Sequence, residues 1–230
     1  MIIVNGVPKS GGWMMVNYFT TCGCELEPGG LMAYHKPTAK LRQATGKPWD
    51  KYLVRPVNEV LADYSRKRVI SGHFNSCVDL PGHDVVFVYR HPRDVLVSHA
   101  RWRAVDLDWT GKTEPSRAVV DSFMHNTGII STLLRQHRDF YGWLEKGIPV
   151  KFSDFVSDKN IARDLCAALD LPYHDPAESL CGNAPWVTKE YRGTWSGNHS
   201  HWEEFWDSTV DSLWQQYGGP EVETLYGFRD

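Results

Sequence analysis

Residues 6–13 combine the backbone and side-chain types that bind an anion. They read Gly-Val-Pro-Lys-Ser-Gly-Gly-Trp and join a short β-branched run to an apolar segment with helical spacing. Small residues let the backbone bend until several N–H groups face one point, and a helix that starts there adds partial positive charge. A strand-to-helix turn favours Gly and Ser for its bend alone. The full charge of Lys9 in its middle, however, indicates a site for a phosphate or phosphosulfate group.

A second candidate anion site lies in residues 85–98. An apolar run of buried-strand type is followed there by a helix pattern with Pro92 and Asp94 in its first turn. Arg90, at the end of the strand, and Ser98, about two turns into the helix, can converge and offer a guanidinium fork and a hydroxyl to a phosphate. The alternative is that Arg90 only forms an ion pair with Asp94.

Strand and helix patterns alternate along the chain and must position these two segments. Apolar, β-branched runs predict strands over residues 2–7, 68–71, 84–89 and 148–152. Helical spacing predicts helices over residues 12–22, 93–103, 115–146 and 158–169. Such alternation predicts an α/β, P-loop-like three-layer fold, in which helices flank a central, mainly parallel sheet. Both candidate sites then lie at the carboxyl ends of strands, where such sheets bind ligands.

The two remaining stretches, residues 23–49 and the tail beyond Leu171, are rich in Gly, Pro, Trp and His and show little periodicity. We expect them to form loops with short helices that wall a substrate pocket.

Composition and charge limit the class of protein. A length of 230 residues with 42% hydrophobic residues suits one domain over residues 1–230. A formal charge of -3 provides no basic surface for nucleic acid. Five cysteines without paired CxxC elements favour neither a disulfide framework nor a zinc site. The chain opens on a strand pattern and has no run of the roughly 18 apolar residues that a membrane helix needs. We therefore expect a soluble cytoplasmic monomer or homodimer without nucleic-acid or membrane partners.

The first candidate site resembles the 5′-phosphosulfate loop of the sulfotransferases that use 3′-phosphoadenosine 5′-phosphosulfate (PAPS). That loop reads Pro-Lys-Ser-Gly-Thr-Thr-Trp in the family, and four positions match it: Pro8, Lys9, Ser10 and Gly11. Gly12 and Trp13 replace the two threonines, so the resemblance implies that backbone N–H groups carry more of the binding. Met14 stands at the family's Trp position, which leaves Trp13 as the candidate for stacking on the adenine.

The second candidate site resembles the family's Tyr-x-x-Arg-Asn-Pro-Lys-Asp-x-x-x-Ser motif, whose Arg and Ser hold the 3′-phosphate. Arg90 and Ser98 are the matching residues, and His91 takes the place of the usual Asn. Two phosphate loops at one sheet edge suit a ligand with phosphate at both ends, which PAPS has and ATP lacks.

Two further segments resemble family motifs less closely. Residues 191–205 look like a loosened form of Arg-Lys-Gly-x-x-Gly-Asp-Trp, which implies that Arg192 and Gly193 close over the 3′-phosphate. The alternative for this segment is a surface loop before an amphipathic helix. Phe152 stands at the Tyr of the family's Tyr-Glu-Asp-Leu, where its ring can stack on the nucleotide.

Sulfuryl transfer to an alcohol needs a group that accepts the hydroxyl proton and positive charge near the bridging oxygen. His73 follows the expected strand over residues 68–71 after Gly72, and the family's catalytic His lies in a similar strand-end context. The resemblance implies that His73 is the base, that Lys9 donates to the bridging oxygen and that no metal is needed, since the sulfuryl group carries one charge. The product would be 3′-phosphoadenosine 5′-phosphate (PAP).

The acceptor implied is a small molecule with a hydroxyl or an amine, for example in natural-product metabolism. Residues 102–114 are expected to line its pocket, and Asp106 and Asp108 either favour a cationic acceptor or belong to a solvated loop.

Two other functions remain open. A P-loop kinase of a small metabolite would need GxxxxGK[ST], whereas here Lys9 precedes Gly11 and Gly12. A nucleotide-binding module without catalysis would keep both loops.

Overall fold

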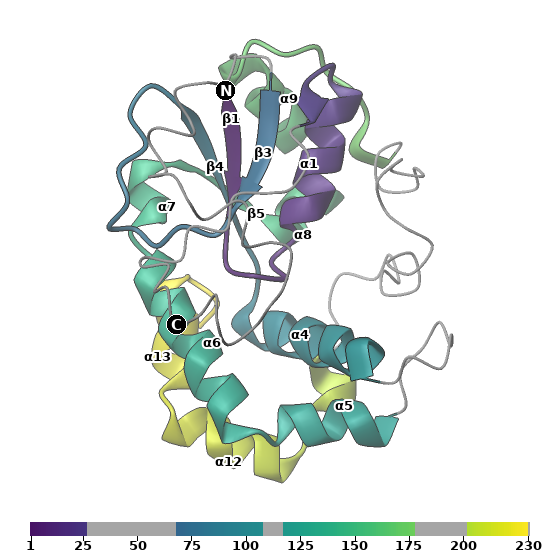
Figure 1. The fold of residues 1–230 in the computed structure, drawn as a ribbon, viewed down its shortest axis with the longest axis vertical. Helices are drawn as coiled ribbons and strands as arrows, with labels where there is room; N and C mark the ends of the chain where they lie inside the picture. Colours follow the sequence, from purple (N-terminus) through teal and green to yellow (C-terminus); the bar gives the residue numbers. More distant parts are fainter. Residues whose placement is uncertain (27–67, 108–116, 178–201, 230) are drawn as a thin grey trace, which may run out of the picture.

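The computed structural model describes residues 1–26, 68–107, 117–177 and 202–229. Its centre is a parallel sheet with strand order β2-β3-β1-β4-β5 (Figure 1). The strands are β1 (Ile2–Asn5), β2 (Glu25–Leu26), β3 (Arg68–Gly72), β4 (Asp84–Tyr89) and β5 (Ile148–Lys151). This confirms the predicted α/β fold with a central parallel sheet.

Both faces of the sheet are buried. In β1, Ile2 and Val4 pack into one apolar cluster and Ile3 packs into the other, and β4 repeats this alternation. Since neither face meets water, the middle positions of these strands are apolar, which explains why the sequence shows continuous apolar runs.

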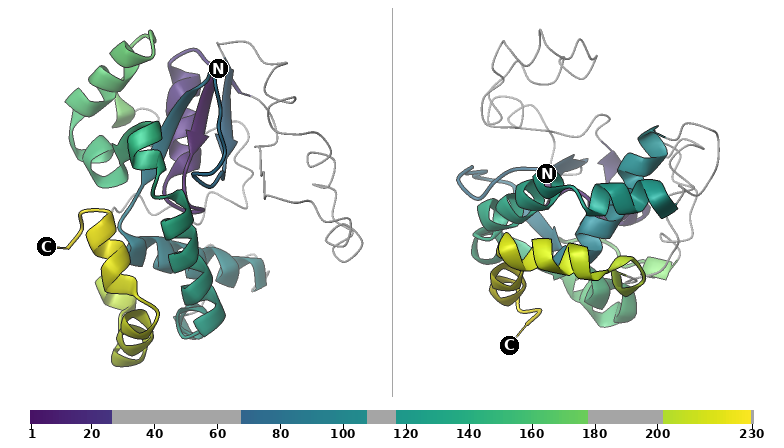
Figure 2. Two further views of the ribbon diagram at one scale, coloured as in Figure 1. Left: turned by 90° about the vertical axis from the view of Figure 1, so that its left-hand side faces the viewer. Right: turned by 90° about the horizontal axis from the view of Figure 1, so that it is seen from below.

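The helices form two groups, each packed into one of the two apolar clusters. One group consists of α1 (Gly12–Thr21), α8 (Phe152–Ser157) and α9 (Lys159–Ala168). The other consists of α4 (Pro92–Leu107), α5 (Arg117–Met124), α6 (Thr127–Phe140), α7 (Trp143–Lys146), the 3₁₀ helix η2 (Trp202–Phe205), α12 (Ser208–Gln216) and α13 (Gly219–Leu225). In the second group, α7 packs beside β5, whereas α4, α5 and α12 lie beyond the carboxyl ends of the strands (Figures 1 and 2). With helices on both sides of the sheet, the fold has the three layers that the sequence predicts.

Several details differ from the sequence-based expectation. The strand expected over residues 2–7 ends at Asn5, and the helix expected over residues 93–103 extends to Leu107. The single helix expected over residues 115–146 is divided into α5, α6 and α7. The first break falls at Asn126, which has an extended backbone and whose side chain caps α6 by accepting from the Ile129 N–H. The strand expected to run to Phe152 ends one residue earlier, since Phe152 begins α8. The edge strand β2 lies where a loop was expected, and its two residues are too few to show periodicity.

The central strand β1 determines where the site residues meet. Asn5, its last residue, pairs with Gly72 of β3 on one side and with Phe87 of β4 on the other. The segments that follow these three strands therefore leave the same edge of the sheet, next to one another.

A buried histidine on α6 predicts acid sensitivity of the fold. His137 donates from Nδ1 to the Leu133 carbonyl at 2.9 Å, and burial lowers its pKa to about 4. The imidazole is therefore neutral in the folded protein, whereas in the unfolded chain it binds a proton near pH 6.5. Stability from this group is complete above pH 6.5 and is lost as the pH falls toward 4, by about 2–3 kcal/mol at pH 4.5.

Urea unfolding at pH 7 and pH 4.5 tests this expectation. His137→Phe keeps the ring volume and removes the titration, so the variant should lose about 2–3 kcal/mol less between the two pH values than the natural protein does. Equal losses in both proteins would contradict it.

Candidate active site

The loop between β1 and α1 is a tight turn tied to the end of β4. The Ser10 N–H donates to the Val7 carbonyl at 3.1 Å, Pro8 is the second residue of the turn and Lys9 has a φ of 75°. This is the pattern of a type II turn, although Lys9 stands where glycine is usual. The Ser10 hydroxyl lies 2.7 Å from the Val7 carbonyl oxygen and 2.9 Å from that of Val88. Ser10 therefore shapes the loop with both of its polar groups.

The helix α1 starts without a side-chain cap, so its first backbone N–H groups can bind an anion. Gly11 is the N-cap residue with a φ of 111°, and no side chain caps the helix there. A Cβ on Gly11 would lie 2.2 Å from a ring carbon of Phe152, whereas a Cβ on Gly12 would meet nothing closer than 3.8 Å. Of these two positions, Gly11 is the one where both the backbone conformation and the lack of space require glycine. The backbone N–H groups that follow it, in the first turn of α1, suit an anion.

The two glycines give a matched pair of variants. Gly11→Ala is expected to lower the free energy of unfolding by about 2–3 kcal/mol, because it combines an unfavourable φ with an overlap on the Phe152 ring. Gly12→Ala should cost less than about 0.5 kcal/mol, since the methyl group has room inside a helix. Chemical denaturation measures both, and equal losses would show that the loop does not need the bare backbone of Gly11.

Lys9 links this loop to α4. Its Nζ lies 4.4 Å from the centroid of the Trp102 ring, a cation–π contact. Trp102 also packs against His99, whose pKa falls to about 4 because of burial and the positive charges of Arg103 and Lys9. Trp102 begins the stretch expected to line the acceptor pocket. The side chain of Asp106 and all of residues 108–116 lie outside the described part.

Arg90 follows β4 directly and is largely buried. Its Nε lies 3.7 Å from the Asp94 carboxylate, so the ion pair considered from the sequence is present, at long range. Burial lowers the pKa of the guanidinium, and the Asp94 charge opposes that shift. Ser98 is half-buried on α4, one turn beyond Asp94 and on the same side of the helix.

Phe152 joins the two candidate phosphate sites. The ring is buried, packs against the backbone of Gly11 and lies 5.0 Å from the Arg90 guanidinium carbon. Its place at the start of α8, directly after β5, brings a third strand end into the site. The structure thus assembles Gly11, Arg90 and Phe152, which are far apart in the sequence.

His73 follows β3 and is held against the loop between β1 and α1. Its Nδ1 lies 2.6 Å from the Gly6 carbonyl oxygen, and since a carbonyl only accepts, Nδ1 carries the proton and Nε2 keeps a lone pair. Burial lowers the pKa of His73; the Gly6 bond opposes that shift, and the charge of Lys9 adds to it. The imidazole is therefore neutral at pH 7, the state a general base needs.

Asn5, which the sequence did not single out, fixes the segment that carries His73. Its side chain is fully buried, donates to the Phe74 carbonyl at 3.1 Å and accepts from the Phe74 N–H at 2.8 Å. The only sequence signal for this role is a polar residue at the end of an apolar strand.

The remaining predicted residues have varied positions. Trp13 is 52% exposed in the first turn of α1, whereas Met14 packs against the apolar cluster. Of the two side chains, Trp13 is therefore the one accessible for stacking. The Nδ1 of His91 accepts from the Arg93 N–H at 3.2 Å and so caps the start of α4. Arg192 and Gly193 lie outside the described residues.

Comparisons with known proteins identify the fold. No protein-family model matches the sequence. A search of curated proteins finds no significant match. A structure of retinol dehydratase with androsterone and the inactive cofactor PAP is similar, with a TM-score of 0.56 and 14% identity over 96% of this chain and 80% of that one. A mouse sulfotransferase, SULT7A1, complexed with PAP gives a TM-score of 0.53 and 14% identity over 98% and 88% of the two chains.

The chain has the sulfotransferase fold. In it, the Lys9 loop, His73, Arg90 and Phe152 occupy the carboxyl ends of neighbouring parallel strands. Among residues 1–26, 68–107, 117–177 and 202–229, no three metal-binding side chains are grouped so that they could hold an ion. No helix in these ranges is long and apolar enough to cross a membrane.

Proposed function

We propose that this protein is a sulfotransferase that transfers the sulfuryl group of PAPS to a hydroxyl, or alternatively an amine, of a small molecule. The observation that carries the proposal is the contact of one buried ring, Phe152, with both the Gly11 backbone and the Arg90 guanidinium. Two anion-binding elements that share one wall suit a nucleotide with phosphates at both ends. The PAP in both similar structures agrees with this ligand.

The residues present fit the donor nucleotide. The uncapped start of α1, with Lys9 beside it, suits the 5′-phosphosulfate through the N–H groups of Gly12 and Trp13. Arg90 and Ser98 suit the 3′-phosphate, since a guanidinium and a hydroxyl both donate to phosphate oxygens. The exposed ring of Trp13 is available for stacking on the adenine. Arg192 and Gly193 belong to this proposal on sequence grounds.

The chemistry proposed for the chain's own residues is proton transfer and charge stabilisation. PAPS supplies the sulfuryl group: as the acceptor oxygen bonds to sulfur, the bond from sulfur to the bridging oxygen breaks and PAP leaves. His73 accepts the hydroxyl proton at Nε2, which is free because Nδ1 is bound to Gly6. Lys9 turns its ammonium group from Trp102 to the bridging oxygen and stabilises the charge that develops there.

Calorimetric titration with PAP and with ATP, in the presence of EDTA, tests the donor. PAP is expected to bind about 10- to 100-fold more tightly than ATP, because only PAP presents a 3′-phosphate to Arg90. Tighter binding of ATP, followed by phosphoryl transfer once Mg²⁺ is added, would favour the P-loop kinase.

Turnover is then measured as PAP release from PAPS with a panel of phenols, alcohols and amines. Release that depends on an acceptor supports the transferase, and the panel identifies the acceptor class. Tight PAP binding without any release would leave a nucleotide-binding module instead.

A further inference from the structure

Alternate residues on either side of Arg90 contact the C-terminal part of the chain. The Tyr89 ring lies 5.9 Å from that of Tyr226 and 6.2 Å from that of Phe228. The His91 ring lies 4.8 Å from Phe228 and 5.9 Å from Trp202. The backbone that carries Arg90 is therefore held from the side opposite to the one where Arg90 meets Phe152.

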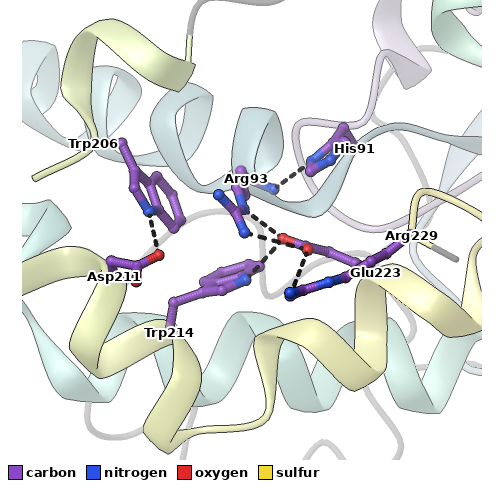
Figure 3. Close-up of polar contacts among 7 residues, drawn as sticks. All are labelled: His91, Arg93, Trp206, Asp211, Trp214, Glu223 and Arg229. Atoms are coloured by element: carbon purple, nitrogen blue, oxygen red, sulfur yellow. Dashed lines mark hydrogen bonds and ion pairs between the residues drawn. The ribbon is translucent and has the colours of Figure 1, made fainter. Parts of the chain in front are cut away.

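Arg93, the next alternate residue, makes the strongest of these contacts (Figure 3). Its guanidinium carbon lies 4.4 Å from the ring centroid of Trp202 and 4.7 Å from that of Trp206. Its Nε and Nη2 donate to the two carboxylate oxygens of Glu223, at 2.5 and 3.3 Å. A bidentate pair of this kind fixes direction as well as distance.

Glu223 is buried on α13 and satisfied from three sides (Figure 3). Only 3% of the residue is exposed, and Trp214 donates its indole N–H to the same carboxylate at 2.9 Å. Arg229 adds a third contact, with 3.9 Å between Nη1 and Oε2. A carboxylate buried this deeply is stable only while its partners keep their positions.

The two arginines of this turn thus have different surroundings. Arg93 forms a close ion pair with Glu223. Arg90 instead lies over the Phe152 ring and forms a long-range ion pair with Asp94. We propose that Glu223 is a positioning residue for the donor site: through Arg93 it fixes the first turn of α4 and so directs Arg90 toward the 3′-phosphate. This inference rests on the proposed function, because it assigns the 3′-phosphate to Arg90.

Glu223→Gln tests the role through the preference of the protein for PAP over AMP, measured by calorimetry. The two nucleotides share the adenosine and the 5′-phosphate, so their affinity ratio reports the 3′-phosphate site alone. We expect the ratio to fall about tenfold in the variant, with AMP affinity unchanged, since a displaced guanidinium loses its phosphate contact. Glu221→Gln, at an exposed position of the same helix, should keep the natural ratio.

A second variant provides the test if Glu223→Gln alone does not fold. Arg93→Met combined with Glu223→Gln removes both buried charges, so it should fold and still show the reduced ratio, because the tie to α13 is absent. A natural ratio in either folded variant would overturn the positioning role. Failure of the proposed function is a different result, namely a natural protein that binds PAP no better than AMP.

Discussion

Replacing Lys9 by alanine or by glycine is expected to lower turnover about 100- to 1000-fold, because both variants remove the charge that the proposed mechanism places at the leaving oxygen. The two variants should differ in stability. Lys9 has a φ of 75°, where a residue with a Cβ is strained and glycine is not. Both lose the contact with Trp102 equally, so the glycine variant should be about 1 kcal/mol more stable than the alanine variant.

Kinetics of PAP release and urea unfolding measure the two effects on the same samples. Lys9→Met is the control for side-chain length, since it keeps the strained residue and an apolar stem but removes the ammonium group. It should be as slow as the alanine variant. Turnover within about threefold of the natural rate in any of the three variants would remove Lys9 from the chemistry.

His73→Gln is expected to lower turnover about 100- to 10000-fold, the usual contribution of a positioned general base. Glutamine can still donate an N–H to the Gly6 carbonyl that His73 Nδ1 now contacts, so the loop should keep its shape while the proton acceptor is lost. PAP affinity should consequently remain within about twofold of the natural value, which separates loss of chemistry from loss of the site.

The pH profile gives an independent measurement of the same role. Burial and Lys9 lower the pKa of His73, so the natural protein should be fully active at pH 7 and lose activity only as the pH falls below about 6.5. The residual activity of His73→Gln should lack this acidic limb. The matched control is His83→Gln, at the amino end of β4, which should keep both the rate and the limb. An unchanged profile in His73→Gln would assign the base elsewhere.

Much of the fold follows from local patterns in the sequence. The bounds of β1, β3 and β4 agree with the prediction to within two residues, since a strand buried on both faces forms a largely apolar run. The prediction of one helix over residues 115–146 missed the break at Asn126, because a capping residue inside an apolar pattern changes the periodicity only slightly. The expected end of β5 was wrong by one residue for a related reason: an apolar Phe152 suits either a strand end or a helix start.

The sequence by itself singled out two candidate anion-binding segments, Lys9 with its glycines and Arg90 with Ser98, because turn chemistry and strand ends are encoded within about ten residues. Only the tertiary structure decided how these segments are supported. Asn5 holds the backbone beside His73, Phe152 fills the space between Gly11 and Arg90, and Glu223 pairs with Arg93 across 130 positions of the chain. Contacts between residues so far apart in the sequence depend on how the whole chain packs around the sheet, and the local sequence pattern does not predict them.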